Sequence, residues 1–558
     1  MLFFRRTVRV YGQRVGVVDG DQRWTYEEFA RRCNALAWGL RDLGLLAGER
    51  AALLSPNTHR ALECYYAVPL AGGILVPLNI RLSLADYRYI LRHCQARLLL
   101  ADPELQAAAA QLARELPQLR LVWLAGGPEE LSRQGGPAME DVSAGSPGLP
   151  PGHAFSEQLI AAHLARSPLD HPVDLEGLDE NELITLNYTS GTTAHSKGVM
   201  LSHRNAALNV VDFLVHGQLR VDDVYLHTLP MFHVNGWGGV WAVSAAGATH
   251  VCLPRIDVPR ILELIDRLGV TMACAAPTVM VMIASHPAAQ TWRAPRRVRW
   301  YVGGAAPPAA LIEELEERLG FEVVHVYGLT ETSPWLTVCE WRPEWAQLDP
   351  ARRAALKARQ GIGQLMAGEV RVARPDLTDV AADGREVGEI VVRGPTVMKG
   401  YYLDPEATQR AMEGGWLHTG DLAVLHPDGY IQVVDRAKDI IITGGENVSS
   451  LEVESVLYQH PAVLEAAVVA APDPKWGEVP KAFVVVRPGS SVSAQELIDF
   501  CRERMAHFKA PKQVEFVEAL PKTATGKIQK YLLRQRVRPP SAPAAEEAAH
   551  AAHSPGLS

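Results

Sequence analysis

The chain of 558 residues has no neighbouring cysteines. Its seven cysteines are scattered along the sequence, and no two of them show the C-x-x-C spacing of a zinc site or a redox motif. An odd number of isolated cysteines is typical of free thiols in a reducing compartment, and it argues against a disulfide framework. We therefore expect no cysteine-based metal site, and we expect a cytoplasmic protein.

An excess of positive charge and a long apolar run are also missing. Lys and Arg total 55 against 63 Asp and Glu, a net charge of −8, so no nucleic-acid partner is expected. The apolar run in residues 1–6 is too short for a signal peptide. The longest uncharged run, residues 268–285, contains Gly269 and Pro277 and predicts a strand at 270–275 followed by a helix. No integral membrane association is therefore expected.

What is present is an ordinary globular composition, arranged as alternating helical and strand-like segments. Apolar residues make up 47% of the chain and charged residues 21%, and the length is enough for at least two domains. A helix is predicted over residues 24–48, entered through Thr25. Strands are predicted at 50–54, 74–77, 97–101, 120–124, 250–254 and 298–302. This alternation predicts an α/β fold with mixed and mostly parallel sheets covered by helices.

The predicted strands become shorter and more closely spaced in the last third of the sequence. Short strand-like runs at 388–393 and 430–434 are separated by Asp-Gly turns, which predicts a small β-barrel-like subdomain or sheet. We expect a large domain over residues 1–435 and a small α+β domain over 437–536. Residues 537–558 are rich in Pro and Ala and are expected to be disordered.

Residues 188–198 are the most informative stretch for chemistry. They contain several hydroxyl side chains, glycines and Lys197, and they follow shortly after the apolar run 183–186. A strand that leads into such a loop presents N–H groups, hydroxyls and an ammonium to a polyanion such as a triphosphate. The loop is not a Walker A motif, because Gly198 follows the lysine where Ser or Thr is needed. A plain flexible connection is the competing interpretation.

Five further motifs follow in order along the chain. The first, 303–308, contains glycines that permit close approach of the backbone to a flat ring or a phosphate. The other four combine glycine with an aromatic ring, a hydroxyl, a carboxylate or a lysine, and they span 327–332, 415–421, 435–447 and 521–527. Together with the loop, this series resembles the adenylate-forming (AMP-binding) superfamily from about Gly16 to about Arg536. Within it, residues 230–237 and 445–450 are most similar to bacterial fatty acyl-CoA synthetases.

The resemblance implies an ATP-dependent, AMP-forming carboxylate–CoA ligase. Such enzymes activate a carboxylic acid, here a fatty acid, with MgATP to an acyl-adenylate and pyrophosphate. They then transfer the acyl group to the thiol of CoA, giving acyl-CoA and AMP. The implied partners are the small-molecule acid and CoA, a homodimer is left open, and the small C-terminal domain is implied to be a mobile lid.

The resemblance assigns the ATP site residue by residue. The phosphate loop would wrap the β- and γ-phosphates with Thr189, Ser190, Gly191, Thr192, Thr193 and Lys197. Adenine would lie between an aromatic ring and a glycine-rich backbone, at Tyr327, Gly328, Thr330, Gly303, Gly304 and Ala305. Asp421 would accept hydrogen bonds from both ribose hydroxyls, with Arg436 in support. Asp428, which like Asp421 lies beside a glycine, is interpreted as a turn residue.

The implied catalytic set is Lys527, Thr193, Glu331 and His233. Thr193 and Glu331 would help to hold Mg²⁺, a hard cation that takes oxygen ligands and bridges phosphates. Lys527 would place an ammonium between the carboxylate and the α-phosphate, where it offsets the charge that gathers as one anion attacks another. Without the motif around it, Lys527 would be a solvated charge, and Glu331 alone would be a helix cap.

Five residues receive further roles from the resemblance. His233 and Trp237 belong to the segment that lines the acyl pocket in the family, although His233 alone is more typical of a core histidine. Lys438, two residues after Arg436, is the implied hinge of the lid. Gly444 and Gly445 would suit a narrow tunnel for the pantetheine arm of CoA.

The phosphate loop departs from the family pattern at two positions. Ala194 stands where glycine is usual, and Ser196 where proline is frequent. If the backbone at 194 needs φ > 0, alanine costs on the order of 1 kcal/mol. Serine in place of proline loosens the loop. We expect an active site with weaker nucleotide affinity.

Two other functions remain open from the sequence. In the first, the protein is an adenylating enzyme that loads a carrier protein, although the 558 residues show no carrier-domain pattern. In the second it is a nucleotide-binding relative with weakened catalysis, for which the altered loop is the support. The joint presence of Lys527, Glu331, Asp421 and Arg436 argues against the second alternative.

Overall fold

A computed structural model describes residues 1–133, 153–189, 196–523 and 528–537. These residues divide into two compact units. The first contains Met1–Thr419 and Ala423–Val433, and the second contains Gly420–Leu422, Val434–Thr523 and helix α18 (Lys530–Val537). Since α18 ends at Val537, helical structure reaches one residue into the segment predicted to be disordered. Residues 538–558 lie outside the described part.

The first unit is built on two large sheets. In the eight-stranded sheet the strand order is β19-β9-β8-β4-β3-β5-β6-β7. The six strands from β8 to β7 run parallel, and β9 and β19 add antiparallel at one edge. Their bounds are β3 (Arg50–Leu54), β4 (Ile74–Pro77), β5 (Ala96–Ala101), β6 (Arg120–Trp123), β7 (Ala154–Phe155), β8 (Leu183–Thr189), β9 (Lys197–Ser202) and β19 (Gly400–Tyr401).

In the nine-stranded sheet the order is β16-β15-β14-β13-β12-β10-β11-β1-β2. The strands from β14 to β1 are parallel, and β15, β16 and β2 are antiparallel at the edges. Their bounds are β1 (Val15–Asp19), β2 (Gln22–Thr25), β10 (Val224–Leu226), β11 (Thr249–Val251), β12 (Met272–Ala275), β13 (Val298–Val302), β14 (Phe321–Gly328), β15 (Trp335–Val338) and β16 (Ile362–Gly363). The predicted α/β fold with mixed and mostly parallel sheets is therefore confirmed.

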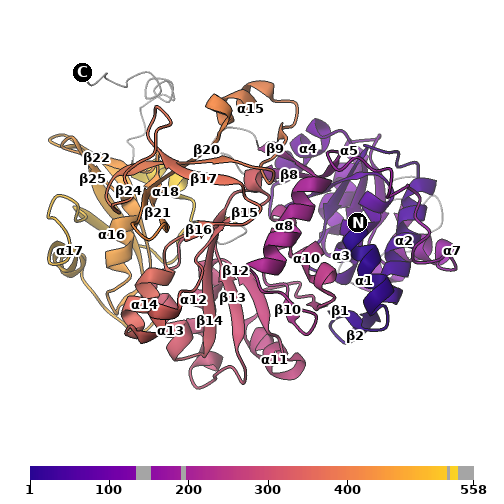
Figure 1. The fold of residues 1–558 in the computed structure, drawn as a ribbon, viewed down its shortest axis with the longest axis horizontal. Helices are drawn as coiled ribbons and strands as arrows, with labels where there is room; N and C mark the ends of the chain where they lie inside the picture. The colour runs from indigo at the N-terminus through magenta and orange to yellow at the C-terminus, as the bar shows by residue number, and fades with distance from the viewer. Residues whose placement is uncertain (134–152, 190–195, 524–527, 538–558) are drawn as a thin grey trace. The chain divides into compact units, whose positions relative to one another are not determined.

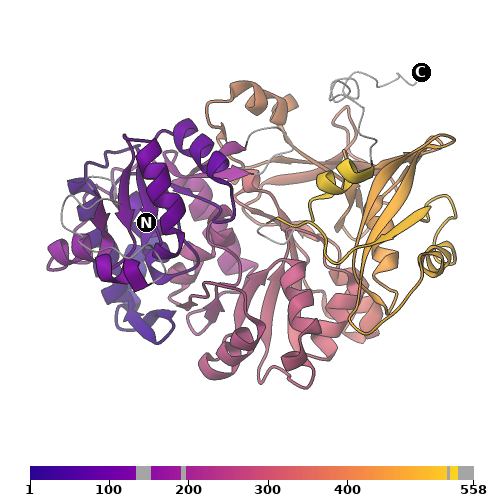
Figure 2. The ribbon, with the colours of Figure 1, turned by 180° about the vertical axis from the view of Figure 1, so that it is seen from behind.

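Helices fill the space between the sheets and cover their outer faces (Figures 1 and 2). The largest core joins inward side chains of both sheets to α1 (Leu2–Tyr11), α2 (Tyr26–Asp42), α3 (His59–Leu70), α8 (His203–Val215) and α10 (Gly239–Ala246). Alternate strand residues face outward, because successive side chains of a strand point to opposite faces. They pack against α4 (Leu84–His93) and α5 (Gln106–Glu115) on one sheet, and against α11 (Val258–Leu268), α12 (Pro277–Ser285) and α13 (Ala309–Glu317) on the other.

Helix α2 begins as predicted but ends earlier. The Thr25 side chain accepts a hydrogen bond from the Glu28 N–H, and the Glu28 carboxylate accepts one from the Thr25 N–H, which is a capping box. The helix ends at Asp42, whereas the prediction extended it to residue 48. The reason is Gly44, whose φ of +87° turns the chain into the left-handed region.

A four-stranded sheet forms the smaller β part of the chain, in the order β17-β18-β20-β21. It contains both predicted short strands. The bounds are β17 (Glu369–Ala373), β18 (Val387–Arg393), β20 (Leu417–Leu425) and β21 (Ile431–Arg436). Residues 420–422 of β20 and 434–436 of β21 belong to the second unit.

The rest of the second unit is a small α+β domain. Its strands are β22 (Ile441–Thr443), β23 (Glu446–Val448), β24 (Val463–Asp473), β25 (Gly477–Val486) and β26 (Gln513–Phe516). The helices α16 (Ser450–Leu457) and α17 (Ala494–Arg502) share a core with these strands. Helix α18 contributes Leu533 to a smaller cluster beside Phe483.

Two expected absences can be compared with the structure. All seven cysteines are free and buried, in agreement with the expectation of no disulfides. Among the residues that the structure describes, no helix combines the length and apolar character needed to cross a bilayer.

Candidate active site

The predicted phosphate loop connects two antiparallel strands. Thr189, the last residue of β8, pairs with Lys197, the first residue of β9. These two predicted residues thus stand on either side of the loop base. Ser190, Gly191, Thr192 and Thr193 lie outside the described residues, as does Ala194.

The predicted adenine residues lie at the ends of two neighbouring strands. β13 and β14 pair in parallel, and Gly303 and Tyr327 come at their carboxyl ends, the edge at which α/β sheets bind ligands. A Cβ at Gly303 would lie 2.4 Å from the carbonyl oxygen of Val326, so glycine is required for this close approach. Gly304 adopts φ +79°, which also favours glycine. The structure therefore brings the two motifs together.

Glu331 lies in the short 3₁₀ helix η3 (Thr330–Thr332) that follows β14. Its Oε1 accepts a hydrogen bond from the Tyr401 hydroxyl, at 2.8 Å. The capping contact of η3 is made instead by Thr332, whose hydroxyl accepts from the Leu329 N–H at 3.0 Å. The helix-cap interpretation of Glu331 is therefore not supported.

The surroundings of Glu331 fit one particular kind of metal site. Its side chain is half-buried, and no described residue donates a hydrogen bond to its Oε2. The described residues contain no group of three or more His, Cys, Asp or Glu that could enclose a metal ion. A single carboxylate oxygen suits Mg²⁺, which is usually bound through one or two carboxylates and substrate phosphates.

The predicted acyl segment forms a left-handed turn. Val234, Asn235, Gly236, Trp237 and Gly238 have φ values of +35°, +61°, +54°, +56° and +81°. Trp237 is buried, at 5% exposure, and its Cη2 atom lies 3.0 Å from the Cβ position of Gly303. The predicted acyl and adenine motifs therefore touch each other.

His233 enters this turn in an extended conformation. It precedes α9 (Val234–Trp237), and its N–H donates to the Pro230 carbonyl at 3.0 Å. His233 is half-buried. The core histidines of the first unit are others, such as His227 and His325, which are almost fully buried. His233 is therefore not one of the fully buried core histidines, and its place in an acyl pocket stays a prediction.

A buried polar triad behind the turn was not predicted. Asn235 Nδ2 donates to Thr185 Oγ1 at 3.1 Å, and Asn187 Nδ2 donates to Asn235 Oδ1 at 3.2 Å. The Thr185 hydroxyl donates to Asn187 Oδ1 at 2.8 Å, and all three residues are buried. Asparagine also tolerates φ > 0 better than most residues. The signal available in the sequence was the alternation of polar residues at 185, 187 and 189 with Leu186 and Tyr188 along this strand.

The second unit contains the predicted ribose pair. Arg436 Nε lies 3.1 Å from Asp421 Oδ1, and the Asp421 side chain is buried. Gly420, with φ +72°, turns the chain directly before the carboxylate. Beyond Arg436, Lys438 is exposed in a turn closed by the hydrogen bond from Asp439 N–H to the Arg436 carbonyl, at 2.9 Å.

Gly444 and Gly445 form the two-residue turn between β22 and β23. Their φ values are +59° and +87°, and Thr443 pairs with Glu446 across the turn. Two consecutive residues with φ > 0 favour glycine in such a hairpin. A Cβ at Gly444 would also lie 2.8 Å from the ring of Trp476. The turn thus accounts for both glycines, and their role towards CoA stays a prediction.

Lys527 lies outside the described residues, but the base of its loop is described. Gln529 N–H donates to the Pro521 carbonyl at 2.8 Å, and Lys522 forms an isolated antiparallel β-bridge with Ile528. The described segments on either side of residues 524–527 therefore pair with each other, and the chain leads from them into α18.

A buried ionic cluster holds the beginning of α18. Lys530 Nζ lies 2.7 Å from Glu454 Oε1 and donates to the Ser450 hydroxyl at 2.6 Å. Asp435 Oδ2 in turn accepts from the Ser450 N–H at 2.6 Å. Burial alone would lower the pKa of Lys530, but the Glu454 and Asp435 carboxylates outweigh it and hold that pKa above its ordinary value. The segment after Lys527 is thereby attached next to Arg436.

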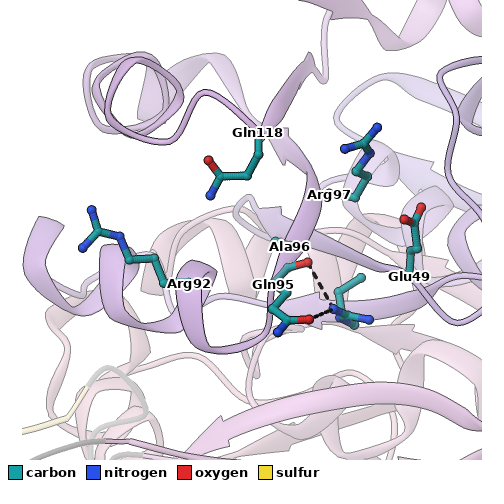
Figure 3. A pocket seen from close by; sticks show the side chains of 7 residues that line it. Glu49, Arg92, Gln95, Ala96, Arg97 and Gln118 are labelled. Atoms are coloured by element: carbon teal, nitrogen blue, oxygen red, sulfur yellow. Dashed lines mark hydrogen bonds between the residues drawn. The ribbon is translucent and has the colours of Figure 1, made fainter.

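A pocket of about 510 Å³ lies elsewhere on the first unit (Figure 3). It is found where β3 and β5 begin, at the amino ends of the parallel strands, and Arg50 donates there to Gln95 Oε1 at 3.0 Å. Its lining consists of Glu49, Arg50, Arg92, Gln95, Ala96, Arg97 and Gln118. None of the predicted site residues lines it.

Comparison with known proteins agrees with this arrangement. Residues 4–402 match the family described as AMP-binding enzyme, and residues 452–527 match the AMP-binding enzyme C-terminal domain. A 2-methylpropanoate–CoA ligase of Humulus lupulus is 39% identical over 550 residues, covering 96% of this chain and 94% of that protein. A peroxisomal butyrate–CoA ligase of Arabidopsis thaliana is 39% identical over 542 residues, covering 95% of this chain and 92% of that protein. The crystal structure of an anthranilate CoA ligase with anthranoyl-AMP superposes with a TM-score of 0.80 at 27% identity, covering 96% of each chain.

Proposed function

Because this chain belongs to the AMP-binding enzymes, we propose that it is an ATP-dependent, AMP-forming carboxylate–CoA ligase. In the first step the acid's carboxylate attacks the α-phosphate of ATP, forming an acyl-adenylate and releasing pyrophosphate. In the second step the thiol of CoA displaces AMP to give acyl-CoA. The observation that carries the proposal is the contact of Trp237 with Gly303, since activation requires the acid to meet the nucleotide.

The first unit holds ATP through its triphosphate and its base in this proposal. Thr189 and Lys197 bind the phosphates together with the loop that joins them, and the ammonium of Lys197 offsets their negative charge. Adenine lies against the ring of Tyr327 and the backbone of Gly303 and Gly304. The support is the position of these residues at the carboxyl ends of β13 and β14.

Glu331, with Thr193, holds Mg²⁺ when MgATP binds. The ion supplies charge neutralisation at the phosphates, which lowers the repulsion that an incoming carboxylate meets. The support on the protein side is the half-buried carboxylate of Glu331, which is oriented by Tyr401 through one oxygen.

The second unit contributes the ribose contact and the catalytic lysine. Asp421 accepts hydrogen bonds from the ribose hydroxyls and is held in place by Arg436. Lys527 brings an ammonium to the carboxylate and the α-phosphate during the first step. Lys438 is the hinge about which Lys527 moves away before CoA reacts. The proposed boundary between the two domains lies between residues 435 and 437.

The acid is proposed to be a short aliphatic, fatty-type monocarboxylic acid. Similar proteins are named for 2-methylpropanoate and butyrate, which supports a short chain. The buried indole of Trp237 beside the adenine residues supports a shallow pocket, because a large ring leaves little room beyond it. The proposed location is the cytoplasm, which the free cysteines favour.

Pyrophosphate release tests the proposal. The purified protein is incubated with MgATP and acetate, butyrate, 2-methylpropanoate, octanoate, palmitate or benzoate, each with and without CoA. We expect pyrophosphate with the short aliphatic acids, and acyl-CoA when CoA is present. Pyrophosphate release without acyl-CoA would support a carrier-protein acceptor instead. No pyrophosphate with any acid, together with measurable ATP binding, would support the catalytically weakened alternative.

A further inference from the structure

Tyr401 connects two parts of the proposed ATP site. Its hydroxyl donates to Glu331 Oε1 at 2.8 Å, and the Nζ atom of Lys197 lies 4.8 Å from the centroid of its ring. An ammonium within about 6 Å of an aromatic ring is attracted by the negative face of the ring. One side chain therefore contacts both the proposed metal ligand and the lysine that leaves the phosphate loop.

The backbone around Tyr401 makes the same connection. β19 (Gly400–Tyr401) pairs antiparallel with β9, Tyr401 opposite Val199, and Tyr402 N–H donates to the Gly198 carbonyl at 2.7 Å. Met398 N–H donates to the carbonyl of Glu331 at 2.8 Å. Residues 398–402 are thus bonded to the strand that leaves the phosphate loop and to the segment that carries Glu331. Tyr401 cannot move freely with respect to either.

We propose that Tyr401 is a positioning residue for the magnesium-binding carboxylate of Glu331 and for Lys197. The inference rests on the proposed function. A hydrogen bond to Oε1 fixes the rotamer of the carboxylate and leaves Oε2 for the ion. Removing such a hydrogen-bond partner from a metal ligand typically weakens metal binding about 10–100-fold. The aromatic ring restrains the ammonium of Lys197 beside the loop, which prepares both groups for the same phosphates.

The variant Tyr401→Phe tests the hydrogen bond, since it removes the hydroxyl and keeps the ring. Binding of Mn²⁺ is measured by electron paramagnetic resonance in the presence of ATP and in the absence of any acid, so that no turnover takes place. We expect about tenfold weaker Mn²⁺ binding, with the melting temperature close to that of the wild type. In steady-state assays the KM for MgATP should rise at low Mg²⁺ and return towards the wild-type value at high Mg²⁺.

Tyr402→Phe is the matched control. It removes a hydroxyl one residue away, which forms no hydrogen bond with a described residue, and its ring lies edge-on to His93. Tyr402→Phe should leave Mn²⁺ binding unchanged. Tyr401→Leu removes the ring as well, and we expect it to weaken ATP binding beyond the effect of Tyr401→Phe, at all Mg²⁺ concentrations.

Glu331→Gln separates this inference from the function on which it rests. If Glu331→Gln weakens Mn²⁺ binding and Tyr401→Phe binds Mn²⁺ like Tyr402→Phe, then the positioning role is wrong and the metal role stands. If Glu331→Gln binds Mn²⁺ as the wild type does, the metal role itself is wrong. If Tyr401→Phe has a lower melting temperature, the electron paramagnetic resonance spectra are recorded at a temperature at which circular dichroism shows that the variant is folded.

Discussion

Arg436 and Asp421 form an ion pair in which Nε lies 3.1 Å from Oδ1. The two residues are 15 positions apart, on the neighbouring strands β20 and β21. Asp421 is only 4% exposed, while the Arg436 side chain keeps 33% of its surface in solvent. A buried carboxylate held by a guanidinium is oriented before any ligand arrives.

The substitution Asp421→Asn tests the ribose role. It removes the charge and one acceptor oxygen while the shape of the side chain is kept. Hydrogen bonds to charged groups contribute about 1.5–3 kcal/mol, so we expect about 10–100-fold weaker binding of ATP and AMP. Titration calorimetry measures both. Asp376→Asn, in an exposed turn of the first unit, should bind ATP like the wild type. Equal affinity of Asp421→Asn and the wild type would remove the ribose assignment.

Several parts of this arrangement follow from local sequence patterns. The strands at 50–54 and 74–77 were predicted with their bounds, because each is a short apolar run ended by turn residues. The strand at 250–254 was placed slightly too late, since β11 covers Thr249–Val251. The apolar run there continues through Cys252 and Leu253 beyond the hydrogen-bonded strand, so the pattern alone does not mark its end.

Other parts depend on contacts that no local pattern contains. Tyr401 meets Glu331 because β19 pairs with β9, which lies about 200 residues earlier in the chain. The contact between Trp237 and Gly303 requires five successive residues with φ > 0, although only two of them are glycines. Likewise Gly444 and Gly445 are explained by a hairpin turn, which their sequence alone did not distinguish from a ligand site.

Trp237→Ala tests the acyl pocket. Loss of the indole should open space beside Gly303, so we expect longer acids to gain activity relative to butyrate, with the KM for ATP little changed. Truncating a buried tryptophan also lowers stability by about 3–5 kcal/mol. Trp345→Ala is the control, because Trp345 is equally buried at 5% exposure but packs with Tyr430. Acid profiles and thermal melting are measured for both. An unaltered profile in Trp237→Ala would indicate packing only.

Lys438→Pro tests the hinge. The N–H of Lys438 donates no hydrogen bond to a described residue, so proline removes none that the structure shows. It does fix φ and restrict Ala437 before it, which limits rotation of the backbone. We expect pyrophosphate release to remain and acyl transfer to CoA to fall at least tenfold, since conformational steps limit many enzymes. Lys438→Ala should retain both steps. Equal loss of both steps in Lys438→Pro would contradict the hinge.

Stability should fall at acid pH because of buried histidines. Burial lowers the pKa of His325 from 6.5 to about 4, and its Nδ1 hydrogen-bonds the Ala358 carbonyl. A lowered pKa means that the folded state prefers the neutral ring. Its stabilising contribution is therefore complete above pH 6.5 and is lost as the pH falls towards 4. At about 1.4 kcal/mol per pKa unit, the loss is about 3 kcal/mol.

Urea unfolding at pH 7 and at pH 4.5 measures this effect. His325→Gln should lose less stability between the two pH values than the wild type does, because glutamine does not titrate. His507→Gln changes an exposed histidine and should follow the wild type. His227, whose pKa burial lowers to about 3, contributes in the same direction and remains in both variants. Identical pH dependence in His325→Gln and the wild type would show that His325 does not control acid unfolding.

Lys527 separates the two chemical steps. In the proposed first step the carboxylate of the acid approaches an α-phosphate that is already negative, and the proposed role of the Lys527 ammonium is to offset that repulsion. Losing one such preorganised group lowers the rate by about 10²–10³-fold. In the second step the leaving group is AMP and the nucleophile is the CoA thiol, so this ammonium is no longer needed at the carboxylate.

Lys527→Ala should therefore release pyrophosphate about 10²–10³-fold more slowly than the wild type, yet convert supplied acyl-adenylate and CoA to acyl-CoA at nearly the wild-type rate. Lys522→Ala is the control from five residues earlier in the chain, because Lys522 is paired with Glu465 at 2.5 Å and its ammonium is already engaged. Its melting temperature should fall slightly, with both steps retained. Wild-type pyrophosphate release by Lys527→Ala would leave this lysine a solvated charge, whereas loss of both steps would mean that it also supports the thiol transfer.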